Sequence, residues 1–144
     1  SNAIYNRWLY DEASGKYQRT VDQNNAATVA DENYALLVDN VTGEAVTADN
    51  VVILFVPYSY FVKNATEVVM DVNMVGSGDA LIARDGQIFT VYWQRETSAS
   101  TLTLVDGEGN AFPFKPGNTW FEVVGSSSQR SQQDSAWRIT FAIP

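Results

Sequence analysis

Apolar and polar residues alternate with a period of two in several short segments of this 144-residue chain, which constrains the fold more than any other feature. The clearest segments carry apolar residues at alternate positions: Val68, Met70, Val72 and Met74 in the first, and Trp137, Ile139, Phe141 and Ile143 in the second. Alternation with this period is typical of a β-strand that buries one face. We therefore predict two half-buried strands here.

The apolar run Val51–Val56 has no polar side, which is typical of a strand covered on both faces. Pro57 follows directly and cannot donate a backbone hydrogen bond to a central ladder. We expect the chain to leave the sheet or to run along its edge at this proline.

Turns that contain glycine separate the predicted strands. Asp85-Gly86 is typical of a two-residue type I′ hairpin, and Pro116-Gly117 of the central pair of a type II turn. Gly76 and Gly78, with Ser77 between them, could instead belong to a phosphate loop, but such a loop needs a helix after it, and Ala80–Ala83 has the pattern of a strand. We predict a structural turn or bulge there, without a phosphate ligand.

Eight or nine short strands with regular turns predict an all-β fold, a mostly antiparallel sandwich or partly open barrel with at most one or two short helices. Ser1-Asn2-Ala3 looks like the remnant of a cleaved tag, so residues 4–144 are expected to form a single domain. Gln23–Asn33, part of a polar stretch, predicts either a short helix or a loop. Gly125–Ser135, rich in Ser and Gln, is predicted to be an exposed, mobile loop.

The composition excludes several classes of function. The chain has no cysteine and no histidine, which rules out disulfides, Cys/His zinc sites, thiol nucleophiles and His-based triads. Nine Lys and Arg against 17 Asp and Glu give a net charge of −8, which opposes binding to nucleic-acid phosphates. Calcium takes oxygen ligands, and Asp71–Gly76 starts like an EF-hand calcium loop. Val75, however, occupies one of the ligand positions of such a loop. We predict no cofactor, no metal site and no nucleic-acid partner.

Carboxylates are numerous enough to keep one enzymatic hypothesis open. Glu67, Asp71 and Glu122 lie in predicted strands, and a glycosidase needs two carboxyl groups about 5–10 Å apart across a cleft. The sequence cannot show such a pair, so we predict no catalytic residue. A carboxylate-based hydrolase acting on cell-envelope glycans remains the alternative function.

Aromatic residues, 12% of the chain, supply the candidate contact surface. Tyr58 and Tyr60 follow Pro57 and share one side of the chain if the backbone stays extended. If that side lies at the rim of the fold, the two rings form an amphipathic patch for a sugar ring or a partner protein. Full burial of both rings would remove the patch from consideration.

The order of several short motifs resembles the C-terminal domain of the YerB-like lipoproteins of Gram-positive bacteria, a family of unassigned function. The residues that carry the resemblance are Trp8-Leu9-Tyr10-Asp11, Gly15-Lys16-Tyr17-Gln18-Arg19, Thr42-Gly43-Glu44, Thr47–Val52, Gly76-Ser77-Gly78, Arg84-Asp85-Gly86, Trp93 and Pro116–Val124. The resemblance covers roughly residues 7–124 and supplies no catalytic residues.

The resemblance implies an extracytoplasmic module, held at the cell membrane by a lipid anchor outside this chain and preceded by another domain. Its expected partners are that upstream domain and a protein or glycan of the cell envelope. With no catalytic constellation in the sequence, the expected function is non-catalytic binding.

Overall fold

The computed structural model describes residues 5–141, which form β-strands and one 3-10 turn, η1 (Val29–Asp31). The strands are β1 (Asn6–Asp11), β2 (Lys16–Asp22), β3 (Tyr34–Leu36), β4 (Thr47–Ala48), β5 (Asn50–Val56), β6 (Tyr58–Asn64), β7 (Glu67–Val72), β8 (Gly76–Arg84), β9 (Gln87–Arg95), β10 (Thr103–Val105), β11 (Thr119–Gly125), β12 (Gln129–Gln133) and β13 (Ala136–Thr140). The predicted all-β class is confirmed, and none of the sheets in this part of the chain closes into a barrel. The proposed tag remnant Ser1-Ala3 and the strand residue Ile143 lie outside the described residues.

The chain forms two compact units. One combines the described residues up to Val51 with Ala83–Ile88 and Phe114–Trp120, and the other combines Val52–Ile82, Phe89–Pro113 and the described residues from Phe121 onward. The organisation of residues 4–144 as a single domain stays a prediction. No helix in the described residues is long and apolar enough to cross a membrane.

The first unit is organised around β2, which pairs antiparallel with β1, β3 and β4. The β1–β2 hairpin places Asp11 opposite Lys16. The buried core of the unit consists of Tyr17, Ala48, Val51 and Ala83, with Trp8, Tyr10 and Trp120 packed against it. The ring of Trp120 lies 5.4 Å from that of Trp8, and the Arg19 guanidinium covers it.

A buried amide fixes the loop before β11 in the first unit. The Asn50 side chain is fully buried and donates to the Lys115 carbonyl (2.8 Å) and the Thr119 hydroxyl (3.1 Å). Its oxygen accepts the Lys115 N–H at 2.9 Å. An unpaired amide would be costly to bury, so these three bonds explain why a polar residue begins the apolar strand β5.

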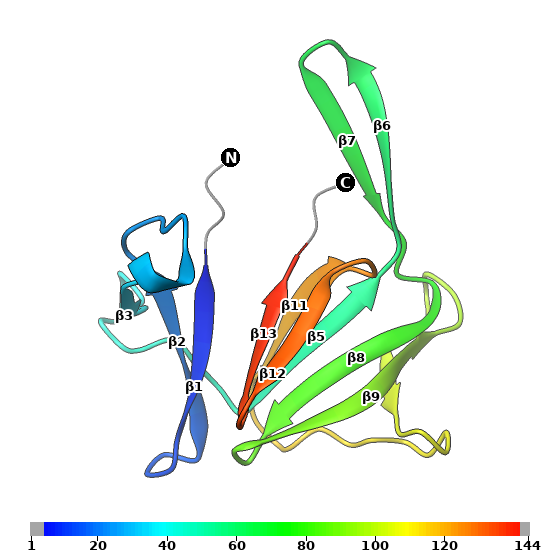
Figure 1. Cartoon of the computed structure of the whole chain (residues 1–144). Helices are drawn as coiled ribbons and strands as arrows, with labels where there is room; N and C mark the ends of the chain where they lie inside the picture. The colour runs from blue at the N-terminus through cyan, green and yellow to red at the C-terminus, as the bar shows by residue number, and fades with distance from the viewer. Residues whose placement is uncertain (1–4, 142–144) are drawn as a thin grey trace. The chain divides into compact units, whose positions relative to one another are not determined.

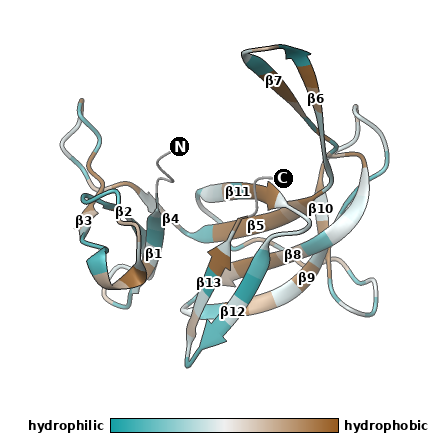
Figure 2. Ribbon diagram, turned by 45° about the horizontal axis from the view of Figure 1, so that its top comes forward, coloured by the Kyte–Doolittle hydropathy of each residue, from teal (hydrophilic) through white to brown (hydrophobic). Residues whose placement is uncertain are grey.

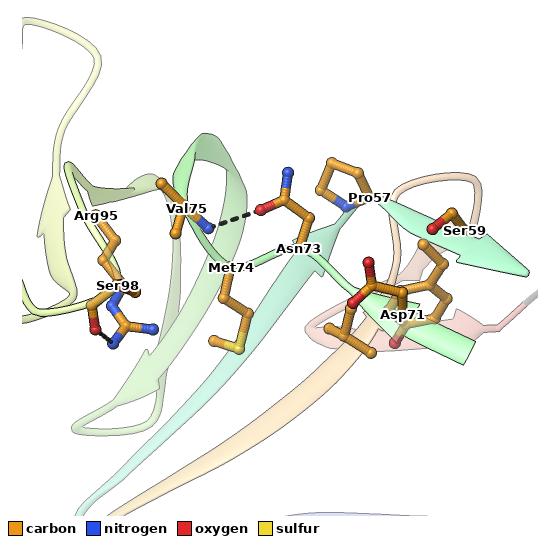
Figure 3. A pocket seen from close by; sticks show the side chains of 10 residues that line it. Pro57, Ser59, Asp71, Asn73, Met74, Val75, Arg95 and Ser98 are labelled. Atoms are coloured by element: carbon orange, nitrogen blue, oxygen red, sulfur yellow. Dashed lines mark hydrogen bonds between the residues drawn. The ribbon is translucent and has the colours of Figure 1, made fainter. Parts of the chain in front are cut away.

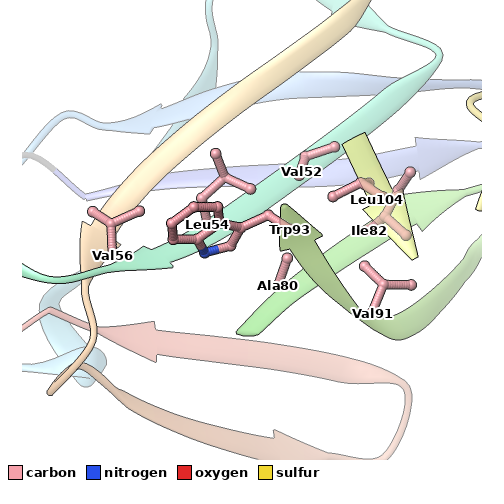
Figure 4. Close-up of a cluster of buried hydrophobic side chains, with 8 residues drawn as sticks. All are labelled: Val52, Leu54, Val56, Ala80, Ile82, Val91, Trp93 and Leu104. Carbon is pink, nitrogen blue, oxygen red and sulfur yellow. The ribbon is translucent and has the colours of Figure 1, made fainter. Parts of the chain in front are cut away.

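The core of the second unit lies on one face of the five-stranded sheet, whose order is β10-β9-β8-β5-β11. The strand predicted at Val51–Val56 is β5, an interior strand whose residues are buried except for the half-buried Ile53. Its side chains Val52, Leu54 and Val56 pack with Trp93 in this core (Figure 4). Trp93 is fully buried and donates its indole N–H to the Phe55 carbonyl at 3.0 Å. The residues that form this core are Val52, Leu54, Val56, Ala80, Ile82, Val91, Trp93 and Leu104.

The prediction of a loop throughout Gly125–Ser135 is wrong. Residues 129–133 form β12, which pairs antiparallel with β13 from Gln129↔Thr140 to Gln133↔Ala136. Every residue of β12 is exposed, so this strand has no alternating apolar side from which it could be predicted. It is held by Arg130, whose guanidinium lies over the Phe55 ring at 4.3 Å and pairs with Asp79.

The polar stretch Gln23–Asn33 is mainly a loop, with the single turn η1 inside it. Asp22 organises this loop, because its carboxylate accepts the backbone N–H groups of Ala26 and Asn33, each at 2.7 Å. These bonds lower the pKa of Asp22. A loop with at most one short helix agrees with the sequence expectation.

Candidate functional site

The β6–β7 hairpin leaves the five-stranded sheet at Pro57, where the sequence predicts a departure (Figure 1). Within the described residues these two strands pair with each other alone, in register from Tyr58↔Val72 to Val62↔Val68. The base of the hairpin is fastened by two backbone bonds, from Asn73 N–H to the Pro57 carbonyl (3.0 Å) and from Ser126 N–H to the Val56 carbonyl (2.8 Å). The rest of the hairpin extends beyond these bonds.

One face of this hairpin is entirely apolar. Residues that are directly opposite each other in the register share a face, which places six side chains together: Tyr58, Tyr60, Val62, Val68, Met70 and Val72. Tyr58 and Val72, at the base, pack against the core of the second unit. The four outer residues Tyr60, Val62, Val68 and Met70 are called the hairpin face below.

The hairpin face is open to solvent. Val62 is 74% exposed, Val68 64% and Met70 49%, while Tyr60 is half-buried. Figure 2 shows the apolar segments of β6 and β7. The alternation at Val68–Met74 predicts a strand with a buried apolar side, and the structure covers that side only at Val72 and Met74. Sequence reasoning therefore finds the apolar side but not its exposure, and it misses Val62 as a surface residue.

Tyr58 and Tyr60 share a side, as an extended backbone requires, but they have different surroundings. The Tyr58 hydroxyl donates to the Val123 carbonyl at 3.0 Å, and burial raises the pKa of Tyr58. A Cβ on Gly125 would lie 3.2 Å from the Tyr58 ring, which is closer than ordinary van der Waals contact. The Tyr60 ring meets the Tyr58 ring edge-on, with centroids 6.4 Å apart. Tyr58 thus fastens the hairpin to the second unit, and Tyr60 begins the exposed face.

The side opposite the hairpin face carries Phe61 and Val69 as well as Ser59 and Asp71, and further polar residues lie at the turn end of the hairpin. Lys63 pairs with Glu67 at 3.4 Å, and the Asn64 amide donates to the same carboxylate at 2.7 Å. The Asn64 side-chain oxygen also accepts the backbone N–H groups of Thr66 and Glu67. Glu67 therefore takes part in the hydrogen bonds and the ion pair of the hairpin turn.

A groove of about 550 Å³ lies at the base of the hairpin (Figure 3). Its lining includes Pro57, Met74, Val75, Asp71 and Arg95. The Arg95 guanidinium donates to the carbonyls of Ser98 and Ser100, so this cation holds its own loop. Asp71 is the sole carboxylate of the lining, whereas glycoside hydrolysis needs two that flank the bond.

Three carboxyl groups, those of Asp11, Asp39 and Asp106, have a lowered pKa because each accepts hydrogen bonds within its own turn. The pKa of Asp11 falls because the Ser14 hydroxyl donates to it, that of Asp39 because the Thr42 N–H does, and that of Asp106 because the Asn110 N–H does. A general acid needs the opposite shift. Among residues 5–141, no three Asp or Glu side chains gather into a group that could hold a metal ion.

Of the two glycines in Gly76-Ser77-Gly78, only Gly78 lies in tightly packed surroundings, since a Cβ on Gly76 would meet nothing within 4 Å. Gly76 and Gly78 are the first and third residues of β8 rather than a separate turn, and the chain bends just before them, at Val75. A Cβ on Gly78 would lie 2.6 Å from the Trp93 indole nitrogen and 2.9 Å from the Phe55 carbonyl. The close approach of Trp93 leaves no room for a side chain at position 78. This packing accounts for the glycine, so no phosphate ligand is needed to explain it.

The two predicted glycine turns lie between strands. Asp85 and Gly86 connect β8 to β9, and both have positive φ, 51° and 74°. Gly117, with φ 133°, follows Pro116 just before β11. A side chain on Gly117 would collide with the Asp49 carboxylate, which accepts the Asn118 N–H at 2.8 Å. Both turns have local structural roles, and neither lies on the hairpin.

Two comparisons with known proteins give a match. The family model described as "Protein of unknown function (DUF3048) C-terminal domain" matches residues 1–121. The crystal structure of the YerB protein from Bacillus subtilis is similar, with a TM-score of 0.67 and 21% sequence identity over 84% of this chain. This chain spans only 36% of that solved chain. The comparison with curated proteins finds no match. The agreement with the family model over most of the sequence shows that the chain belongs to the DUF3048 C-terminal domain family.

Proposed function

We propose that this domain is a non-catalytic protein-binding module of a membrane-anchored, extracytoplasmic protein and that its contact surface is the hairpin face. The observation that carries the proposal is the exposure of Val62, Val68 and Met70 side by side on a two-stranded sheet. Clustered exposed apolar side chains typically mark interaction sites.

The low intrinsic stability of a two-stranded sheet supports the proposal that a partner covers the hairpin face. An isolated hairpin is marginally stable in water and needs a third strand or a packed face. In this domain the base of the hairpin is packed through Tyr58 and Val72, while the outer part has neither a third strand nor a covered face in the described structure. Covering the hairpin face would remove apolar surface from water at about 25 cal/mol per Å².

The chemistry of the face favours a polypeptide over a glycan. Sugar rings stack on the flat faces of exposed aromatic side chains. Here the Tyr60 ring is engaged edge-on with Tyr58, and the remaining surface is aliphatic or thioether: Val62, Val68 and Met70. Aliphatic and Met side chains pack against other apolar side chains. A protein surface of matching character is the partner that this face fits.

Location outside the cytoplasm rests on the resemblance to the YerB-like lipoproteins, and the lack of cysteine in this domain agrees with it. The net charge of −8 argues against a nucleic-acid partner. The alternative of a glycan hydrolase draws no support from the groove with its single carboxylate. We therefore retain the binding function alone.

Photo-crosslinking in the native cell tests the proposed function. The full-length protein would carry p-benzoylphenylalanine in place of Val62, with a control at Val41, which is 94% exposed and lies outside the hairpin. We expect a defined polypeptide adduct from position 62 and none from position 41. Equal adducts at both positions, or no adduct at position 62, would contradict a contact at the hairpin face.

A further inference from the structure

We infer that the protein partner of the hairpin face binds by adding an extended, basic segment as a third strand along the free edge of β7. The inference rests on the proposed function and specifies how its partner is recognised. Three features of the hairpin carry it: the hydrogen-bond register, the different protection of its two edges and the charge of β7.

The register shows which backbone groups of the hairpin point outward. The Asn73 N–H donates to the Pro57 carbonyl at 3.0 Å. In an antiparallel ladder such a bond flanks a pair that has no hydrogen bonds of its own, here Tyr58↔Val72. Bonded and non-bonded pairs alternate, so both pairs of the hairpin face are also non-bonded. Their N–H and C=O groups therefore point toward the outer edges of β6 and β7.

These outer edges are free within the part of the chain that the structure describes. There, β6 and β7 pair with each other alone, and no backbone bond links Val68 or Met70 to another segment. Free N–H and C=O groups at a sheet edge are a template for a further strand. A segment bound in this way places every second side chain beside the hairpin face, so apolar residues at alternate positions match it. The added strand also sets the direction from which the rest of the partner covers the face.

The two edges differ in their protection against pairing. Proline, lysine and register shifts such as β-bulges commonly prevent the addition of a strand at a sheet edge. β6 follows Pro57 directly and carries Lys63. Its register also shifts between Val62 and Asn64. β7, from Glu67 to Val72, contains neither proline nor lysine. The edge of β7 is therefore the one open to a further strand.

The charge of β7 favours a basic segment over a second copy of this domain. β7 carries Glu67 and Asp71 and no Lys or Arg. Glu67 pairs with Lys63, whereas Asp71 forms no ion pair within residues 5–141. A second copy would place another acidic β7 alongside, and like charges that face each other across a sheet are destabilising. A Lys or Arg opposite Asp71 is favourable instead, so the fitting segment has a basic residue between its apolar ones.

Photo-crosslinking of the full-length protein in its native cell tests the edge, with p-benzoylphenylalanine in place of Tyr60. Val68→Pro removes an N–H at the edge of β7 but no bond of the hairpin ladder, and Val62→Pro is the matched change directly opposite on β6. We expect Val68→Pro to reduce the polypeptide adduct at least about tenfold, and Val62→Pro less than about twofold. Hydrogen exchange of the Val69 amide, which lies in a bonded pair, should be equally slow in both purified variants and the parent domain.

The charge of the partner segment has a separate test in the same cells. Asp71→Lys reverses the charge at the edge of β7, and Glu12→Lys makes the same change in net charge at an exposed position outside the hairpin. We expect Asp71→Lys to lower the adduct yield at least about threefold and Glu12→Lys to leave it unchanged. Equal yields from the two variants would contradict a basic segment at β7.

The outcomes separate this inference from the proposed function. Equal yields from the two proline variants, whether high or low, would overturn strand addition at β7 and leave a protein contact at the hairpin face. Loss with Val62→Pro alone would place the added strand on β6 instead. An adduct to a second copy, or to another part of the same chain, would overturn the choice of partner. Absence of any adduct from position 60 in the parent protein would overturn both the inference and the proposed function.

Discussion

At the scale of single residues, the close approach of Gly78 to Trp93 has a direct consequence for stability. A methyl group on Gly78 would meet the indole and the Phe55 carbonyl inside normal contact distance. Overpacking of this kind costs about 1–3 kcal/mol, and each kcal/mol lowers Tm by about 2–4 °C in a domain of this size. We therefore expect Gly78→Ala to lower Tm by several degrees in a thermal melt. Gly107→Ala, where a Cβ meets nothing within 4 Å, should change Tm little.

Tyr17 gives the domain a pH dependence at high pH. Burial raises the pKa of Tyr17 from 10.0 to about 12, because the phenolate would lose its hydration. The folded state therefore holds the proton more tightly than the unfolded chain, and the free energy of unfolding falls as the pH rises from about 10 to about 12. Urea unfolding of Tyr17→Phe across this range should show a smaller decline than the wild type. If the free energy of unfolding declined equally in the variant and the wild type, Tyr17 would have the same pKa in the folded and unfolded states.

Tyr58 and Tyr60 should respond differently to truncation. Tyr58→Ala removes a ring packed on the core and the hydrogen bond to Val123, so we expect a loss of about 3–5 kcal/mol in the free energy of unfolding. Tyr60→Ala removes a half-buried ring and should cost markedly less. Denaturant titration of both variants checks this order. A larger loss for Tyr60→Ala would place the centre of the hairpin packing at Tyr60.

At the scale of elements, Arg130 links the exposed strand β12 to Phe55 and Asp79 of the five-stranded sheet. Arg130 stacks on Phe55 and pairs with Asp79, while the rest of β12 is exposed. Arg130→Ala should therefore accelerate hydrogen exchange of the β12 and β13 amides with little change in β5. Gln132→Ala, on the same exposed strand, is the matched control and should leave exchange unchanged. Equal exchange in both variants would show that Arg130 does not hold the hairpin.

The elements differ in how far the sequence predicts them. Val51–Val56 and the alternation around Trp137 predict β5 and β13, because burial of one or both faces requires those patterns. The Ser/Gln stretch does not predict β12, because a fully exposed strand needs no apolar residues. The position of β12 is set instead by its pairing with β13. Pro57 predicts the departure from the sheet, because it lacks the N–H that a central ladder needs.

The candidate site is predictable only in part for a related reason. Alternation identifies the side of a strand that is apolar, but it does not identify what covers that side. Val68 and Met70 have the same pattern as Val72 and Met74, yet the first pair is exposed and the second packs on the core. Which part of a strand reaches the core depends on where the hairpin leaves the sheet, a property of the whole fold.

At the scale of the whole molecule, the central claim is that the hairpin face is covered by polypeptide outside the cytoplasm. The chain lacks cysteine, so one introduced thiol can report on one position of the domain. Val62→Cys tests the hairpin face, and Val41→Cys tests an exposed position outside the hairpin. In the isolated domain both thiols should react rapidly with a maleimide, because Val62 and Val41 are 74% and 94% exposed.

The decisive measurement is the labelling rate of these two thiols by a membrane-impermeant maleimide, on intact cells that carry the full-length protein. We expect Val41→Cys to react rapidly and Val62→Cys at least ten times more slowly, because a partner surface covers the hairpin face. Equal rates would contradict a covered face, and failure of both thiols to react on intact cells, with reaction after lysis, would contradict the extracytoplasmic location.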